Sequence, residues 1–197
     1  ELLNIGHTAE RFSLLGSLHK RRAMIASGAT ARRRAIDAMA RTYGEAFTIA
    51  SANDATDDVY SLENRLAAEV VLGWLPGGAA AERARIKKQL TAGLRTLRDL
   101  ATQLQASTTF FELSATANHL MLSALATGKV SDHARQQIVQ AYTDAAARGV
   151  TPRHRRSMAD QLRFFMRMAA PLGGAQATAL KRQLLQLGKD LGIADLS

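Results

Sequence analysis

The chain has 197 residues, no cysteine and a formal net charge of +9, and 47% of its residues are hydrophobic but only 5% aromatic. This length suits one sizeable domain or one short solenoid, and the lack of cysteine excludes disulfides, thiolate zinc sites and cysteine nucleophiles. The apolar content is mostly Ala and Leu, which favour helices, and no alternating run of β-branched residues predicts a strand.

Apolar residues at helical spacing predict four helices in the first half of the chain. The first covers about residues 8–27 and is expected to bury one side, formed by Phe12, Leu15, Leu18 and Ile25. The second begins at Thr30 as its N-cap, and the polar stretch 51–58 separates it from the third. The third ends before Gly77, and the fourth carries leucines every three or four residues up to Leu104.

The second half predicts four further helices. The fifth begins near Thr108 and the sixth at Ser131, and each is stopped by a glycine. Thr151 and Pro152 are typical of an N-cap and a first helical residue, so they start the seventh helix. The eighth follows Gly174. We therefore expect eight helices in all.

An ungapped shift of 99 residues aligns the first two predicted helices with the fifth and sixth. The aligned pairs are identical or similar: Phe12 and Phe111, Gly16 and Ala115, Ala35 and Ala134, Met39 and Ile138, Tyr43 and Tyr142, Glu45 and Asp144, Ala46 and Ala145. A fixed period indicates stacked repeats. The sequence therefore predicts an all-α solenoid of about four antiparallel helix pairs, each of roughly 50 residues.

The first pair resembles the tetratricopeptide repeat. Its first helix carries a large residue followed by Leu-Gly, and its second carries small, aromatic and small residues in turn: Phe12, Leu15, Gly16, Ala35, Tyr43 and Ala46. Small residues let two helices approach closely, while the aromatic ring fills the space between hairpins. The resemblance implies a right-handed solenoid that holds a segment of another protein. The unit is longer than the usual repeat of about 34 residues, so a HEAT-like stack stays open.

Two stretches, 60–68 and 156–165, resemble a divergent branch of that superfamily, the TRAF-binding-like helical module of bacterial multidomain signalling or defence proteins. There the module sits beside an effector domain of TIR, caspase-like or trypsin-like type. The chain begins with Glu1 rather than Met, and we expect residues 1–197 to be a single repeat domain cut from a longer protein. No stretch predicts a membrane span or signal peptide, and the lack of cysteine fits the cytoplasm.

In tetratricopeptide proteins the first helices of successive pairs line a groove that holds the partner. Carried over by aligning Phe12 with Tyr60, the resemblance places a set of polar residues on that lining, together with Ser17 and Ser61. The candidate partner-binding residues are Lys20, Arg21, Arg65, Glu69 and His119. Ordinary exposed helix positions are the alternative for each of them.

Two clusters of arginine lie in the first turns of the second and seventh predicted helices, where a cation opposes the helix dipole. Their guanidinium groups suit a carboxylate or phosphate, so they are candidate anion-binding residues, with a solvated face as the alternative. The clusters are Arg32, Arg33 and Arg34, and Arg153, Arg155 and Arg156.

No catalytic motif, phosphate-binding loop or metal-ligand spacing is present, so we expect no enzyme activity, no cofactor and no metal. Two functions compete. The first is a protein-interaction scaffold or sensor module that binds a partner protein, a peptide or an effector domain of the same polypeptide. The alternative is nucleic-acid binding through the basic terminal helix pairs. Few aromatic residues and an acidic third helix favour the first.

Overall fold

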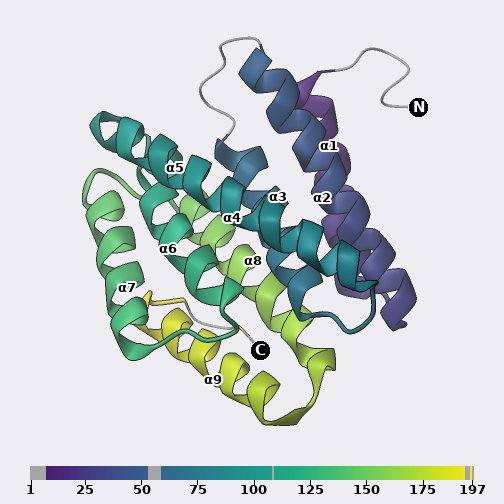
Figure 1. The fold of residues 1–197 in the computed structure, drawn as a ribbon. Helices are drawn as coiled ribbons and strands as arrows, with labels where there is room; N and C mark the ends of the chain where they lie inside the picture. Colours follow the sequence, from purple (N-terminus) through teal and green to yellow (C-terminus); the bar gives the residue numbers. More distant parts are fainter. Residues whose placement is uncertain (1–7, 53–58, 108, 194–195, 197) are drawn as a thin grey trace. The chain divides into compact units, whose positions relative to one another are not determined.

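The structure, a computed structural model, describes residues 8–52, 59–107, 109–193 and 196. Within these ranges all regular secondary structure is helical and no strand occurs (Figure 1), which confirms the all-α fold of antiparallel helix pairs. None of the helices in these ranges is both long and apolar enough to cross a membrane.

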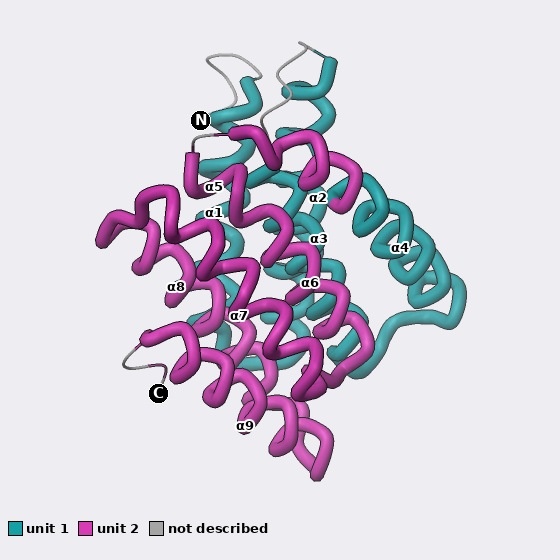
Figure 2. The backbone as a smooth tube through the Cα atoms, turned by 90° about the vertical axis from the view of Figure 1, so that its left-hand side faces the viewer, with its two compact units in different colours: residues 1–97 teal, residues 98–197 magenta. Residues whose placement is uncertain are grey.

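The chain divides into two compact units, residues 1–97 and 98–197 (Figure 2). Unit 1 holds α1 (Ala9–Ile25), α2 (Ala29–Ala52), α3 (Val59–Trp74) and most of α4 (Ala80–Gln103). The boundary between the units falls close to the 99-residue shift found in the sequence, although the single repeat domain over 1–197 stays a prediction.

Unit 2 contains α5 (Phe110–Leu113), α6 (Ala115–Ala126), α7 (Asp132–Ala147), α8 (Pro152–Ala169) and α9 (Gly174–Asp190). Short 3-10 turns extend α4 over Leu104–Ala106 and α8 over Ala170–Leu172.

A close approach between α1 and α2 organises unit 1. Gly16 of α1 lies directly against the ring of Tyr43, because a Cβ atom at Gly16 would come within 2.7 Å of two ring carbons. Tyr43 is fully buried, and its hydroxyl group shares a 2.8 Å hydrogen bond with the hydroxyl of Ser17. The ring therefore occupies the space that a side chain at position 16 would need.

The same close approach corrects the expected core side of α1. Leu18 and Ile25 were expected to be buried, but they are 42% and 80% exposed. The buried positions of α1 are Gly16 and Ala23, since small residues let the two helix backbones come together. Leu18 and Ile25 therefore lie on the outer face of α1, whereas Phe12 and Leu15 are half-buried.

The internal repeat is visible in the core of each unit. Ile138, Tyr142 and Ala145 of α7 are buried, as are the three residues that lie 99 positions earlier in α2. The expected burial of Tyr142 is thus confirmed. Its hydroxyl donates a hydrogen bond to the Oδ1 atom of Asn118 on α6.

Helix boundaries follow their predicted signals with two corrections. Ser131 and Thr151 cap α7 and α8 as expected, each accepting a hydrogen bond from the backbone three residues on. α2 begins at Ala29 rather than after Thr30, while Thr108 and the stretch 53–58 lie outside the described residues. The expected fifth helix is divided at Ser114 into α5 and α6, and there the Ser114 amide and hydroxyl groups donate hydrogen bonds to the carbonyl oxygens of Phe110 and Phe111.

Replacing a glycine within a helix by alanine usually stabilises a protein, but the Gly16–Tyr43 contact predicts the opposite effect at position 16. Gly16→Ala should lower the free energy of unfolding by about 1 kcal/mol or more, since the buried ring cannot yield and overpacking outweighs the better helix propensity of Ala. Gly73→Ala is the matched control in α3, because no atom lies within 4 Å of the added Cβ atom. It should leave stability unchanged or raise it. Urea denaturation measures both, and a Gly16→Ala protein as stable as the wild type would contradict the contact.

Candidate functional site

The first helices of the two pairs in unit 1 are joined by polar side chains. Lys20 of α1 donates a 3.1 Å hydrogen bond to the Oδ1 atom of Asn64 on α3, and the hydroxyl groups of Ser13 and Ser61 are 2.7 Å apart. Asn64 in turn donates to the Tyr60 carbonyl oxygen at 2.9 Å. α1 and α3 therefore lie side by side, as the predicted lining of a groove requires.

Two other candidate residues of the groove form an ion pair between a buried carboxylate and a half-buried guanidinium group instead of an open surface. Glu69 is only 5% exposed, and its carboxylate lies 3.3 Å from the Nε atom of Arg65 one turn earlier in α3. Arg65 lies against Gly44 of α2 and Gly93 of α4, where an added Cβ atom would come within 3.4 and 2.8 Å of its side chain. A partner cannot reach Glu69 without moving these helices.

Burial dominates the electrostatics of Glu69. Desolvation raises the pKa of its carboxyl group from 4.5 to about 6, against the opposing effect of the Arg65 and Arg85 charges. The Oε2 atom of Glu69 and the Nε atom of Arg65 have no hydrogen-bond partner among the described residues. The pair is thus incompletely satisfied.

Arg21 and His119 complete the predicted set. Arg21 is exposed on α1, next to Arg22. His119 lies on α6 of unit 2 and is half-buried, and burial, with the nearby charge of Arg98, lowers its pKa below the ordinary value of 6.5. Partner binding by all five residues stays a prediction.

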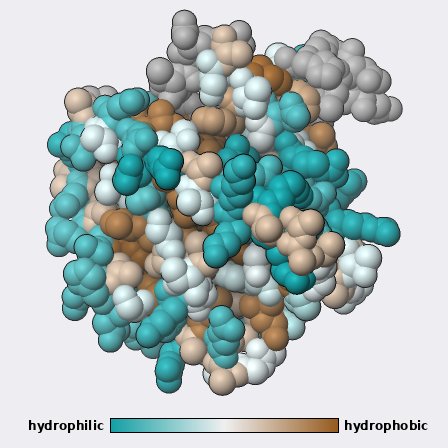
Figure 3. All heavy atoms as spheres, in the orientation of Figure 1, coloured by the Kyte–Doolittle hydropathy of each residue, from teal (hydrophilic) through white to brown (hydrophobic). Residues whose placement is uncertain are grey.

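The outer face of α1 carries an apolar row that the sequence interpretation missed. Leu14, Leu18 and Ile25 are 54%, 42% and 80% exposed, and their spacing of four and seven residues places them on one side of the helix. Arg21 and Arg22 are exposed on the same side. On the face of the molecule that Figure 3 shows, hydrophobic residues are interspersed with hydrophilic ones.

The first arginine cluster is largely occupied within unit 1. Arg32 donates a 2.6 Å hydrogen bond to the carbonyl oxygen of Ala26, and Arg33 forms a 2.8 Å ion pair with Glu82 of α4. The hydrogen bond from Arg33 lowers the pKa of Glu82. Arg34 is exposed. Two of these three candidates thus hold helix ends together.

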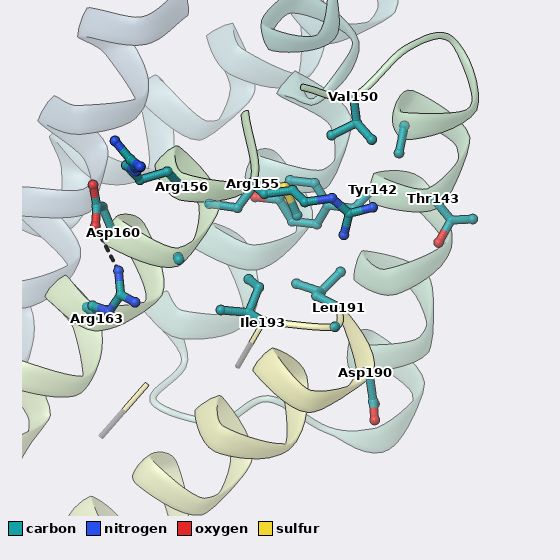
Figure 4. Close-up of a pocket in the computed structure, with 14 residues that line it drawn as sticks. Tyr142, Thr143, Val150, Arg155, Arg156, Asp160, Arg163, Asp190, Leu191 and Ile193 are labelled. Carbon is teal, nitrogen blue, oxygen red and sulfur yellow. Dashed lines mark hydrogen bonds and ion pairs between the residues drawn. The ribbon is translucent and has the colours of Figure 1, made fainter. Parts of the chain in front are cut away.

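The second arginine cluster lies beside a pocket of unit 2 (Figure 4). The pocket has a volume of about 570 Å³ and lies between α7, the first half of α8 and the end of α9. Arg155 and Arg156 line it, whereas Arg153 does not. Figure 4 shows that Arg155 extends toward Tyr142, while Arg156 extends to the other side, near Asp160. Across the described ranges no three His, Asp or Glu side chains are grouped as a metal site would need.

The fold and its contacts define a module of antiparallel helix hairpins whose first helices meet side by side in unit 1. Residues 1–69 match the model of the family Tetratricopeptide Repeats-Sensor, TPR-S. The match covers α1, α2 and most of α3, and it supports the predicted likeness to the tetratricopeptide superfamily, whose repeats serve protein interaction. No curated protein and no solved structure matches the chain.

The raised pKa of Glu69 predicts a specific pH dependence. The carboxyl group of Glu69 keeps its proton up to about pH 6 in the folded chain, but loses it above pH 4.5 in the unfolded chain. Its contribution to the free energy of unfolding is therefore fully present below pH 4.5 and is lost as the pH rises past about 6. Glu69→Gln stays neutral throughout. Its unfolding free energy minus that of the wild type should therefore rise by about 2 kcal/mol between pH 4 and pH 7.5.

Urea denaturation at a series of pH values measures this difference, in which the titration of groups common to both proteins cancels. A difference that does not change with pH would show that the Glu69 carboxyl group titrates alike in the folded and unfolded chain.

Proposed function

We propose that the chain is a non-catalytic protein-interaction module that binds an acidic, amphipathic helical segment along the outer face of α1. The observation that carries the proposal is the exposed row of Leu14, Leu18 and Ile25. Apolar rows on a helix are the usual contact surface for a partner helix, which places its own apolar residues at the same spacing.

Charge selects the kind of partner. Residues 11–25 contain four Arg and Lys side chains and no Asp or Glu, and Arg21 and Arg22 are exposed beside the apolar row. An acidic segment would therefore meet complementary charge, which favours its association and disfavours basic competitors. The match of residues 1–69 to a sensor family of tetratricopeptide type supports the same assignment.

The inner face of α1 is fixed by contacts with α2 and α3, while its outer face stays exposed. Ser13, Gly16, Ser17 and Lys20 all contact α2 or α3, so α1 is a rigid platform. Rigidity lowers the entropy cost of binding. The TRAF-binding-like resemblance extends the proposal to bacterial signalling or defence in the cytoplasm, with the partner segment in another protein or in an effector domain of the same polypeptide.

A peptide selection tests the surface and requires no identified partner. The chain is used to select binders from a random peptide library, and affinities are measured by fluorescence anisotropy. We expect selected peptides to be rich in Asp, Glu and large apolar residues. Leu18→Glu should lower the affinity for these peptides by about 30-fold or more, the scale of an interface hot spot. Leu185→Glu on α9, where the leucine is 38% exposed, is the matched control and should change little.

Selected peptides that bind the Leu18→Glu protein as tightly as the wild type would contradict the proposed surface. Enrichment of basic peptides would contradict the proposed charge of the partner.

The nucleic-acid alternative is tested with the second arginine cluster. Duplex and single-stranded oligonucleotides are titrated at two salt concentrations against the wild type and a variant with Arg153, Arg155 and Arg156 changed to Gln. We expect weak binding that falls steeply with salt in both proteins, because binding to phosphates alone releases counterions. Tight binding near physiological salt that collapses in the variant would favour nucleic acid as the partner.

A further inference from the structure

We propose that the pocket of unit 2 binds a small organic anion in which a carboxylate or phosphate group is joined to an apolar body. The pocket has a volume of about 570 Å³, which lies in the range of about 300–1,000 Å³ typical of small-molecule sites. All of its lining residues belong to unit 2.

Two of the positively charged side chains that line the pocket, Arg155 and Arg156, are not paired with any acidic group that the structure describes. Asp160 is paired with Arg163 at 3.0 Å. Asp190 is paired with Arg135, which projects from α7. Both acidic groups of the lining are thus neutralised. The side chains of Arg155 and Arg156 have no hydrogen-bond or ion-pair partner among the described residues, so the pocket carries uncompensated positive charge.

The position of these arginines is electrostatically unfavourable without a ligand. Both lie near the N-terminus of α8, where the partial positive charge of the helix dipole repels cations. A bound anion would offset this repulsion, because both the helix dipole and the guanidinium groups would attract it. Arg155 is the principal candidate because it extends across the pocket toward Tyr142 (Figure 4).

The remaining wall accepts an apolar group. Val150, Met158, Leu191 and Ile193 line the pocket together with Tyr142. The Tyr142 hydroxyl donates its hydrogen bond to Asn118, so the group that the tyrosine offers to a ligand is its ring. Cationic groups beside an apolar wall are the recognition chemistry of an amphiphilic anion.

The probe is 8-anilinonaphthalene-1-sulfonate, which joins a sulfonate to an aromatic body and becomes fluorescent in apolar surroundings. Its neutral analogue N-phenyl-1-naphthylamine lacks the sulfonate. Both are titrated against the whole chain. Arg155→Gln should raise the Kd of the anionic probe about tenfold, the effect of losing a hydrogen bond to a charged group, and leave the neutral probe unchanged.

Arg153→Gln is the matched control, because it removes the same charge two residues away, from a side chain that does not line the pocket. It should change the Kd of the anionic probe less than twofold. Ala146→Phe places a ring in the pocket and should abolish binding of both probes. Far-ultraviolet circular dichroism shows that each variant remains folded.

The proposal is overturned if Arg155→Gln leaves the affinity of the anionic probe unchanged, or if Arg153→Gln lowers it equally. Competition then identifies the anionic group. Displacement of the probe by benzoate assigns a carboxylate and displacement by phenyl phosphate assigns a phosphate. Displacement by neither anion would overturn the proposed ligand class.

Discussion

The contact between Gly16 and Tyr43 is the constraint on which the rest of unit 1 depends. The buried ring of Tyr43 occupies the volume that a side chain at position 16 would fill, and this sets how closely α1 approaches α2. The same approach brings α1 against α3, where Lys20 reaches Asn64. With its small residues turned inward, α1 must turn Leu14, Leu18 and Ile25 outward, so the surface proposed for partner binding follows from the packing of the core.

Much of the fold could be predicted from the sequence because helix existence depends on local spacing. Leucines every three or four residues, and caps such as Thr151 before Pro152, act within a few residues of chain. The sequence interpretation failed where small residues decided the packing. It gave the core side of α1 to large apolar residues such as Ile25, although the Tyr43 ring of α2 fills that space and leaves room only for small residues on α1.

The candidate sites were harder to predict because their partners are distant in sequence. Arg33 was a candidate anion-binding residue, but it is paired with Glu82, which lies 49 residues away. The neighbouring sequence does not distinguish Arg33 from Arg155, which lines a pocket and lacks such a partner among the described residues. The pocket itself is formed by three separated segments, so its volume and its charge balance exist only after folding.

The internal repeat also indicates whether the helix hairpins require the Arg65–Glu69 ion pair in order to form. If the 99-residue shift is continued into the third helices, Arg65 corresponds to Phe164 and Glu69 to Met168, and both of these apolar side chains are fully buried. A largely buried ion pair in one unit thus corresponds to fully buried apolar residues in the other. Such a replacement is commonly neutral or stabilising, because an ion pair has to be desolvated. The helix hairpins can therefore form without the Arg65–Glu69 pair, and the incompletely satisfied carboxylate of Glu69 is a pH-sensitive group in the core of unit 1.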